Sequence, residues 1–172
     1  TTFKLIRPGL KDRIRGMLWG QFVGDAYCLG THWIYDAGNL DDRQPKGFDA
    51  PGPEHYHTRK EPGHFTHYGD AALILLRSVA EKNGFNPRHF GTLWQDAMDP
   101  AAGYNGYVDH ATKETLAHAR KHAGDKKFTW QDGADDDQLA TASALAPVVA
   151  IHLEDEDWEQ YLEQATRVRQ NN

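Results

Sequence analysis

The chain contains 172 residues, 39% of them hydrophobic and 26% charged, with a formal net charge of −6. This composition is typical of a folded domain with its own core and not of a disordered chain, so we expect one domain over residues 1–172. The acidic balance argues against a protein that binds nucleic acid or an anionic membrane, because such proteins need a basic face.

Cys28 is the single cysteine, and one thiol rules out an internal disulfide. The sequence has no uncharged apolar run of about eighteen residues, so we expect no membrane-spanning helix. The first ten residues, TTFKLIRPGL, lack a long apolar core and do not resemble a signal peptide. We therefore predict a cytoplasmic protein.

The first predicted element is a helix over residues 10–30, LKDRIRGMLWGQFVGDAYCLG. Its apolar residues stand at positions 10, 14, 17, 18, 22 and 26, and spacings of three and four mark one face of a helix. Gly16, Gly20 and Gly24 form a second stripe. Since glycine destabilises an exposed helix by about 1 kcal/mol relative to alanine, this stripe favours close packing against another backbone.

Residues 36–66 are rich in Gly, Pro, Asp and His and predict a long irregular loop, a kind of segment that is often functional. The next segment, DAALILLRSVAEK over residues 70–82, predicts a helix. Asp70 therefore has two interpretations. It is either a metal ligand or a first-turn carboxylate that the helix N–H groups and dipole stabilise.

The second half of the chain predicts four more helical segments. Asn86 and Pro87 begin a helix as N-cap and first residue, and a Gly- and Tyr-containing loop over residues 99–110 precedes a helix at 111–123. A helix should follow the acidic cluster at 135–137, with Pro147 kinking it or cutting it in two. Residues 154–170 predict a last helix, with Arg167 and Arg169 matching its dipole. With little strand signal, the expected fold is all-α, with its loops gathered at one end.

Two segments carry a resemblance to a known family. RIRGMLWGQFVGDAYCLGTHWIYD resembles the opening of the ADP-ribosylglycohydrolase family, and FTHYGDAALILLRSVAE falls where that family has a Thr-Asp-Asp-Thr motif before an apolar helix. NGYVDHATKETL and GADDDQLATASALAPVV are similar to later elements of an atypical branch, in the same order. The resemblance runs from about residue 12 to the end. It implies an all-α fold, a two-metal site for Mg²⁺ or Mn²⁺, and hydrolysis of glycosidic bonds to ADP-ribose.

Placing the family motif on this chain aligns Tyr68, Gly69, Asp70 and Ala71 with Thr-Asp-Asp-Thr. Asp70 then matches the second Asp, and the other three positions lose or alter their oxygen ligands. The resemblance also implies that this chain covers the N-terminal half of the family domain, so the domain is expected to be incomplete. We expect a homo-oligomer or a second chain that completes the domain, because half of a helical domain leaves an apolar face exposed.

Candidate site residues follow from the resemblance and from the residue types. The predicted catalytic residues are Asp36 and Asp70, the predicted metal ligands are Asp70, Asp136 and Asp137, and the predicted substrate contacts are Thr66, His67, Tyr68, Tyr107 and Asp109. Structural alternatives exist for several of these residues. The run Asp135–Asp137 could cap a helix, and Asp25 could accept hydrogen bonds from nearby backbone N–H groups. His32 and Asp36 could form an acid/base pair, or their segment could simply pack inward.

Two functions remain open from the sequence. The first is a divalent-metal-assisted hydrolase that cleaves an ADP-ribosyl or related ribosyl bond, acting on a small-molecule or ADP-ribosylated substrate. The second is a non-catalytic member of the same fold that binds ADP-ribose or a nucleotide, or has become structural. The loss of the paired Asp beside Asp70 supports the second function.

Overall fold

The computed structural model describes residues 8–36, 38, 47–52 and 55–171. Within these residues the chain is helical, and its backbone pairing outside helices includes one isolated bridge between Ala134 and Gln170 but no named strand. The helices are α1 (Leu10–Cys28), α2 (His67–Lys82), α3 (Pro87–Met98), α4 (His110–Lys121), α5 (Ala146–His152) and α6 (Trp158–Arg167), with short 3-10 turns η1 (Leu29–Thr31), η3 (Pro100–Ala102) and η4 (Ala142–Ala144). The predicted all-α fold is confirmed.

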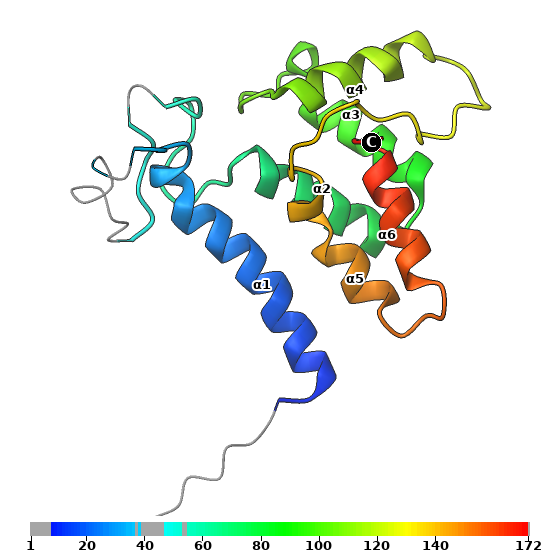
Figure 1. Cartoon of the computed structure of the whole chain (residues 1–172), viewed down its shortest axis with the longest axis horizontal. Coiled ribbons are helices and arrows are strands. Elements are labelled where there is room, and N and C mark those ends of the chain that lie inside the picture. Colours follow the sequence, from blue (N-terminus) through cyan, green and yellow to red (C-terminus); the bar gives the residue numbers. More distant parts are fainter. Residues whose placement is uncertain (1–7, 37, 39–46, 53–54, 172) are drawn as a thin grey trace, which may run out of the picture.

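Helix α2 lies at the centre of the molecule and contacts α1, α3 and α5 (Figure 1). The core forms around it from Leu75 of α2, Trp94 of α3, Leu116 of α4 and Val148 of α5, each at most 2% exposed. Burying such a side chain stabilises the fold by about 1.5–3 kcal/mol relative to leaving it in water. The N-terminal end of α2 is therefore held in place from several sides, and this end carries the aligned motif.

The helix starts have clear local causes. Thr66 is the N-cap of α2, and its hydroxyl accepts the Tyr68 N–H at 3.2 Å. Helix α2 thus begins three residues before the predicted position 70, and Asp70 lies in its first turn, as one of its two interpretations predicted. The prediction of Asn86 as the N-cap of α3 is confirmed, since its side chain accepts the His89 N–H at 2.9 Å.

The segment after the acidic cluster differs from the prediction. No helix begins at residues 135–139, and the next α-helix, α5, starts at Ala146 with Pro147 in its first turn. Pro147 therefore begins a helix instead of kinking one. The expectation that Asp135–Asp137 cap a helix is wrong because no helix starts there. Asp136 instead accepts the backbone N–H of Gln138 at 2.9 Å in an irregular segment.

Helix α1 runs along the side of the bundle and turns its predicted apolar stripe inward, where Phe22 is half-buried and Ala26 is buried. Its outer face leaves Trp19 70% exposed and Val23 47% exposed. The predicted packing of the glycine stripe is not seen: within the described chain, a Cβ at position 16, 20 or 24 would meet nothing within 4 Å beyond the helix's own backbone.

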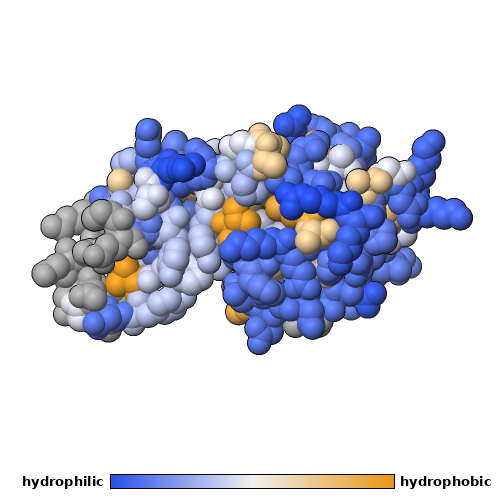
Figure 2. All heavy atoms as spheres, turned by 90° about the horizontal axis from the view of Figure 1, so that it is seen from above, coloured by the Kyte–Doolittle hydropathy of each residue, from blue (hydrophilic) through white to orange (hydrophobic). Residues whose placement is uncertain are grey.

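The surface seen from above is mostly hydrophilic and carries only small hydrophobic patches (Figure 2). None of the helices in the described residues combines the length and the hydropathy that a membrane crossing needs.

Candidate functional site

Asp70 is held by an internal cation. Its Oδ2 accepts from Lys60 Nζ at 2.5 Å and from the Tyr104 hydroxyl at 2.8 Å. The Lys60 side chain is 8% exposed and that of Asp70 is 19% exposed, so the pair is largely shielded from water. Burial and the charge of Asp70 raise the pKa of Tyr104, which keeps its hydroxyl a donor. The carboxylate that the family motif retains is thus neutralised within the chain.

The residues around Asp70 do not match a magnesium or manganese site in the described chain. These ions bind sets of oxygen ligands, but the groups facing this carboxylate are an ammonium and a hydroxyl donor. The preceding position, Gly69, has no room for a carboxylate. A Cβ there would lie 2.3 Å from Oδ2 of Asp25 and 2.7 Å from Cβ of Phe65. The paired Asp of the family motif is therefore incompatible with this packing.

The other predicted acidic residues lie in different surroundings. Asp36 is exposed, and its Oδ1 accepts the Gly38 N–H at 3.0 Å in a local turn. Asp136 is 8% exposed, and its Oδ2 lies 3.0 Å from Nδ1 of His110. Asp137 is exposed. The partners of Asp70 are Lys60 and Tyr104, so the assignment of Asp36, Asp136 and Asp137 to one centre with Asp70 stays a prediction.

Asp25 organises the start of α2. Its two carboxylate oxygens accept the Thr66 N–H at 2.8 Å and the Thr66 hydroxyl at 2.6 Å. Burial raises the pKa of Asp25, and the two hydrogen bonds from Thr66 oppose that shift. The prediction that Asp25 satisfies a nearby backbone N–H is confirmed, and Thr66 serves as a helix cap inside the fold.

Three predicted substrate contacts lie in the interior. Thr66 is 1% exposed, and His67 and Asp109 have no exposed surface. Oδ2 of Asp109 lies 3.2 Å from Nε2 of His67, and its Oδ1 accepts the Thr112 N–H at 2.7 Å as the N-cap of α4. Tyr68 and Tyr107 are half-buried and remain open to contact from outside. The predicted ligand role fits these two tyrosines better than the three buried residues.

Arg169 provides the positive charge of this interior. The segment that carries it lies against the backbone at 133–134, with the Ala134 N–H donating to the Arg169 carbonyl at 3.1 Å. The guanidinium is 5.4 Å from the ring of Trp94, and burial lowers its pKa. Burial alone would raise the pKa of Asp109, but the close approach of His67, the hydrogen bond from Thr112 and the charge of Arg169 hold it well below its usual range. The sequence predicted Arg169 only as a helix-dipole residue.

A histidine cluster adjoins this interior, and sequence reasoning missed it. His32, His57 and His67 each bring one ring nitrogen to within 4.8 Å of the others. They come from the end of η1, from the turn at 55–59 and from the first residue of α2. Burial, followed by the neighbouring histidines, lowers the pKa of His32 to about 4 and that of His57 to about 3. The rings of His55, His57 and His67 surround His32, and its pairing with Asp36 stays a prediction.

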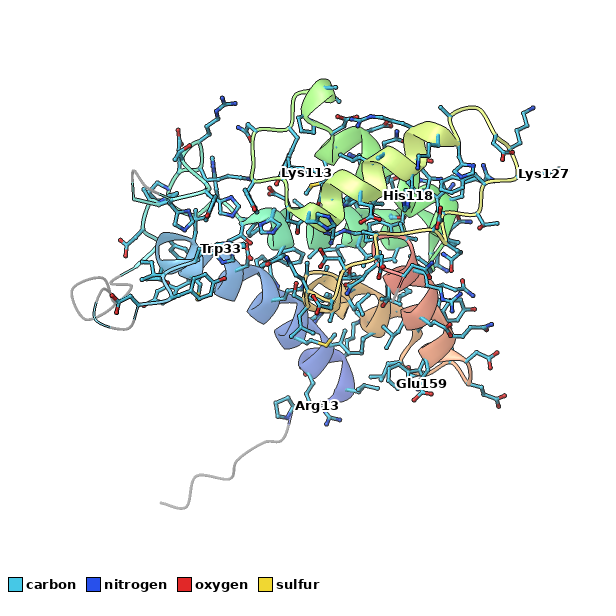
Figure 3. All side chains as sticks on the ribbon, turned by 45° about the horizontal axis from the view of Figure 1, so that its top comes forward. Arg13, Trp33, Lys113, His118, Lys127 and Glu159 are labelled. Atoms are coloured by element: carbon cyan, nitrogen blue, oxygen red, sulfur yellow. The ribbon has the colours of Figure 1, made fainter. Side chains whose placement is uncertain are left out.

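Aromatic rings join the two long loops beside this cluster. The Trp33 ring lies 5.6 Å from Tyr107 and 5.1 Å from Tyr56, measured between centroids, and Tyr56 is 5.0 Å from Tyr107. Trp33 has φ 68°, a left-handed conformation uncommon outside glycine, and it lies in the segment that follows α1 and η1 (Figure 3). The Tyr56 side chain is 59% exposed. Two of the predicted loops meet here and form a partly open aromatic surface, whereas the segment that follows α4 extends on the other side of the fold (Figure 1).

Comparison with known proteins places these features in a family. Residues 6–172 match the family model described as ADP-ribosylglycohydrolase. Crystallin J1A and Crystallin J1B of Tripedalia cystophora are 26% and 23% identical over 176 residues, with 94% and 95% of this chain covered. The alignments cover 53% of each crystallin, so the chain spans about half the length of the curated relatives it matches.

A solved structure shares the fold. It is named "ADP-ribosylglycohydrolase-related protein complex", has a TM-score of 0.69 and is 21% identical, and the match covers 94% of this chain and 50% of that chain. The helical architecture agrees with this likeness, and the family match extends over nearly all of the sequence. This chain therefore belongs to the ADP-ribosylglycohydrolase family.

Proposed function

We propose that this chain is a non-hydrolytic member of its family that binds an ADP-ribose-like nucleotide. The observation that carries the proposal is the ion pair between Lys60 and Asp70, with 2.5 Å between Nζ and Oδ2. The ammonium supplies the positive charge that a metal ion would otherwise bring to this carboxylate. It offers no coordination position for a ribose hydroxyl or a water molecule, which metal-assisted hydrolysis requires.

The binding part of the proposal depends on the aromatic surface of Trp33, Tyr56 and Tyr107. A nucleobase stacks on such rings without needing a particular sequence of hydrogen bonds, and each stacked base contributes about 1–3 kcal/mol. Tyr56 is 59% exposed and Tyr107 is half-buried, so their rings are accessible at the loop end of the fold.

The second candidate is the metal-assisted hydrolase, which the family match favours. It requires Lys60 to leave Asp70 so that Mg²⁺ or Mn²⁺ can approach. Lys60 follows the turn at 55–59 and lies outside any helix, so its backbone is less constrained than that of Asp70. Catalysis by this route would depend on a displacement of Lys60 that the structure does not contain.

Two assays separate the candidates. The purified chain is incubated with an ADP-ribosylated peptide and with Mg²⁺ or Mn²⁺, and released ADP-ribose is measured for the wild type and for Asp70→Asn. We expect no release from either. Release by the wild type that disappears in Asp70→Asn would overturn the non-hydrolytic proposal in favour of the hydrolase.

Binding is measured separately, by calorimetry with ADP-ribose in the presence of a chelator. We expect metal-independent binding that weakens in Tyr107→Ala. The matched control is Tyr27→Ala, because Tyr27 is a partly exposed tyrosine of α1 outside the aromatic surface. Absence of binding, or equal binding by the two variants, would contradict the nucleotide part and leave a structural role.

We also propose that further polypeptide covers the outer face of α1, namely the segment equivalent to the remaining half of the relatives. In its absence a second copy of the chain takes this place. The support is the exposure of Trp19 and Val23 beside a glycine stripe that other described residues do not contact. Close approach of another helix to that stripe would bury both side chains.

A further inference from the structure

We propose that His32, His57 and His67 bind one transition-metal cation, with Zn²⁺ as the best match. The site is separate from the carboxylate of Asp70, and it does not depend on the proposed nucleotide-binding function. Three ring nitrogens, one from each histidine, lie within 4.8 Å of one another. Imidazole nitrogens are ligands that zinc prefers, and three protein ligands leave a fourth tetrahedral position open.

The distance between two of these ligands already suits a tetrahedral ion. Nδ1 of His67 and Nε2 of His57 are 3.3 Å apart. Zinc–nitrogen bonds are about 2.0–2.1 Å long, so two nitrogens on a tetrahedral zinc stand about 3.3–3.4 Å apart. The nitrogen of His32 lies within 4.8 Å of the other two, so binding one ion requires it to approach them more closely.

A buried carboxylate lies behind His67. Nε2 of His67 is 3.2 Å from Oδ2 of Asp109, without the alignment of a hydrogen bond, and Nδ1 of His67 faces Nε2 of His57. A carboxylate behind a histidine ligand is the usual outer-shell partner in zinc sites, because it sets the tautomer and raises the basicity of the ligand. Asp109 is fully buried and anchored as the N-cap of α4, which holds it in this position.

All three histidines carry a buried ring nitrogen that the described residues leave without a hydrogen bond, namely Nε2 of His32, Nδ1 of His57 and Nε2 of His67. His57 is 1% exposed, and its backbone N–H donates to Nδ1 of His55 at 3.0 Å, which holds the turn in place. Burying an imidazole nitrogen without a partner is costly, and a metal ion bound at Nε2 of His32 would compensate that cost for this nitrogen.

Aromatic side chains enclose the three imidazoles. The Tyr68 ring is 3.9 Å from the ring of His67, and the Tyr107 ring is 5.3 Å from it. Trp33 lies 5.6 Å from His32. Such an apolar shell limits access of water to a metal centre. Magnesium is a poor match for this cluster because it requires oxygen ligands, so zinc and magnesium should behave differently.

The test uses the untagged full chain after treatment with a chelator that is then removed. Zinc is added as its chloride, and bound metal is measured by equilibrium dialysis, with cobalt(II) chloride as a spectroscopic probe. We expect one zinc ion per chain, visible absorption typical of tetrahedral cobalt that zinc displaces, and no comparable binding of magnesium. A folded wild-type chain that binds zinc below one equivalent, or gives no tetrahedral cobalt spectrum, would overturn the proposal.

Variants assign the ligands. We expect His57→Gln and His32→Gln to weaken zinc binding by more than the 10–100-fold that loss of an outer-shell partner costs. The matched control is His64→Gln, which removes an exposed histidine of the same loop and should bind zinc as the wild type does. His32 is only partly buried, so its variant should fold even if His57→Gln does not, and circular dichroism checks this. Zinc binding by folded His32→Gln as tight as in the wild type would refute the three-histidine site.

Discussion

The family resemblance puts Gly69 opposite an Asp of the Thr-Asp-Asp-Thr motif, and replacing Gly69 with alanine tests whether this position has room for a side chain. A Cβ at position 69 would lie 2.3 Å from Oδ2 of Asp25, well inside the shortest contact that real Cβ atoms make. Asp25 cannot move away freely because it accepts two hydrogen bonds from Thr66, at 2.8 and 2.6 Å. Gly69→Ala should therefore destabilise the start of α2.

The magnitude follows from three effects. Overpacking a filled site costs about 1–3 kcal/mol. Disturbing hydrogen bonds to the charged Asp25 costs about 1.5–3 kcal/mol for each bond that is lost. Alanine returns up to about 1 kcal/mol of helix propensity. The free energy of unfolding should fall by about 2–4 kcal/mol, which urea denaturation measures as a lower midpoint.

Gly47→Ala is the matched control, since a Cβ there would meet nothing within 4 Å in the described chain and Gly47 lies outside the glycine stripe of α1. This variant should leave the free energy of unfolding unchanged or raise it by up to about 1 kcal/mol. The double variant Gly69→Ala/Asp25→Ala should lose less than the sum of its two single variants, because removing the carboxylate removes the contact with Asp25 and leaves only the contact with Cβ of Phe65. A Gly69→Ala chain as stable as the wild type would refute the packing argument.

Further predictions concern charge, pH and association. Lys60→Met should lower the free energy of unfolding by about 2–3 kcal/mol. This is less than for a fully buried pair, because Asp70 is 19% exposed and keeps its hydrogen bond from the Tyr104 hydroxyl. Unchanged stability in urea would show that the ion pair is dispensable. The pKa values of His32 and His57, about 4 and 3, lie below the 6.5 of an unfolded chain. In the chelator-treated chain the unfolded state thus binds more protons than the folded state. The free energy of unfolding should therefore fall as pH drops from about 6.5 towards 4. Its slope should stay below the limit of about 1.4 kcal/mol per pH unit per histidine, because His32 is partly solvated. Stability that rises over that range would contradict the shifts. Val23→Asp should shift any dimer towards monomer in light scattering, and a wild-type chain that is already monomeric at tens of micromolar would count against the α1 interface.

Much of the fold was predictable because its signals are local. The capping pair Asn86 and Pro87 marked the start of α3, and the apolar spacing of α1 identified its inner face. The segment around Pro147 was harder to predict, since the same proline can interrupt a helix or begin one. In the folded chain Pro147 lies in the first turn of α5. The start of α2 was missed by three residues because Thr66 caps it under the control of Asp25, a residue 41 positions away.

The candidate site was less predictable because its contacts join distant parts of the chain. The resemblance to the family motif pointed to Asp70, but nothing in the sequence indicated that Lys60 would neutralise its charge. His32, His57 and His67 share no spacing that a motif would record, and a long irregular loop brings them together. Arg169 follows α6, and a basic residue at the end of a helix is already accounted for by the helix dipole. Nothing in the sequence therefore indicated that its guanidinium lies buried over Trp94.

Asp109 has three neighbours at once: it caps α4, lies against His67 and balances the charge of Arg169. A substitution that the cap alone would tolerate must therefore also suit an imidazole from α2 and a guanidinium from the C-terminal end of the chain. Among relatives that keep this interior, we therefore expect positions 67, 109 and 169 to change together or not at all. A single carboxylate with three neighbours would then make these positions vary as a group.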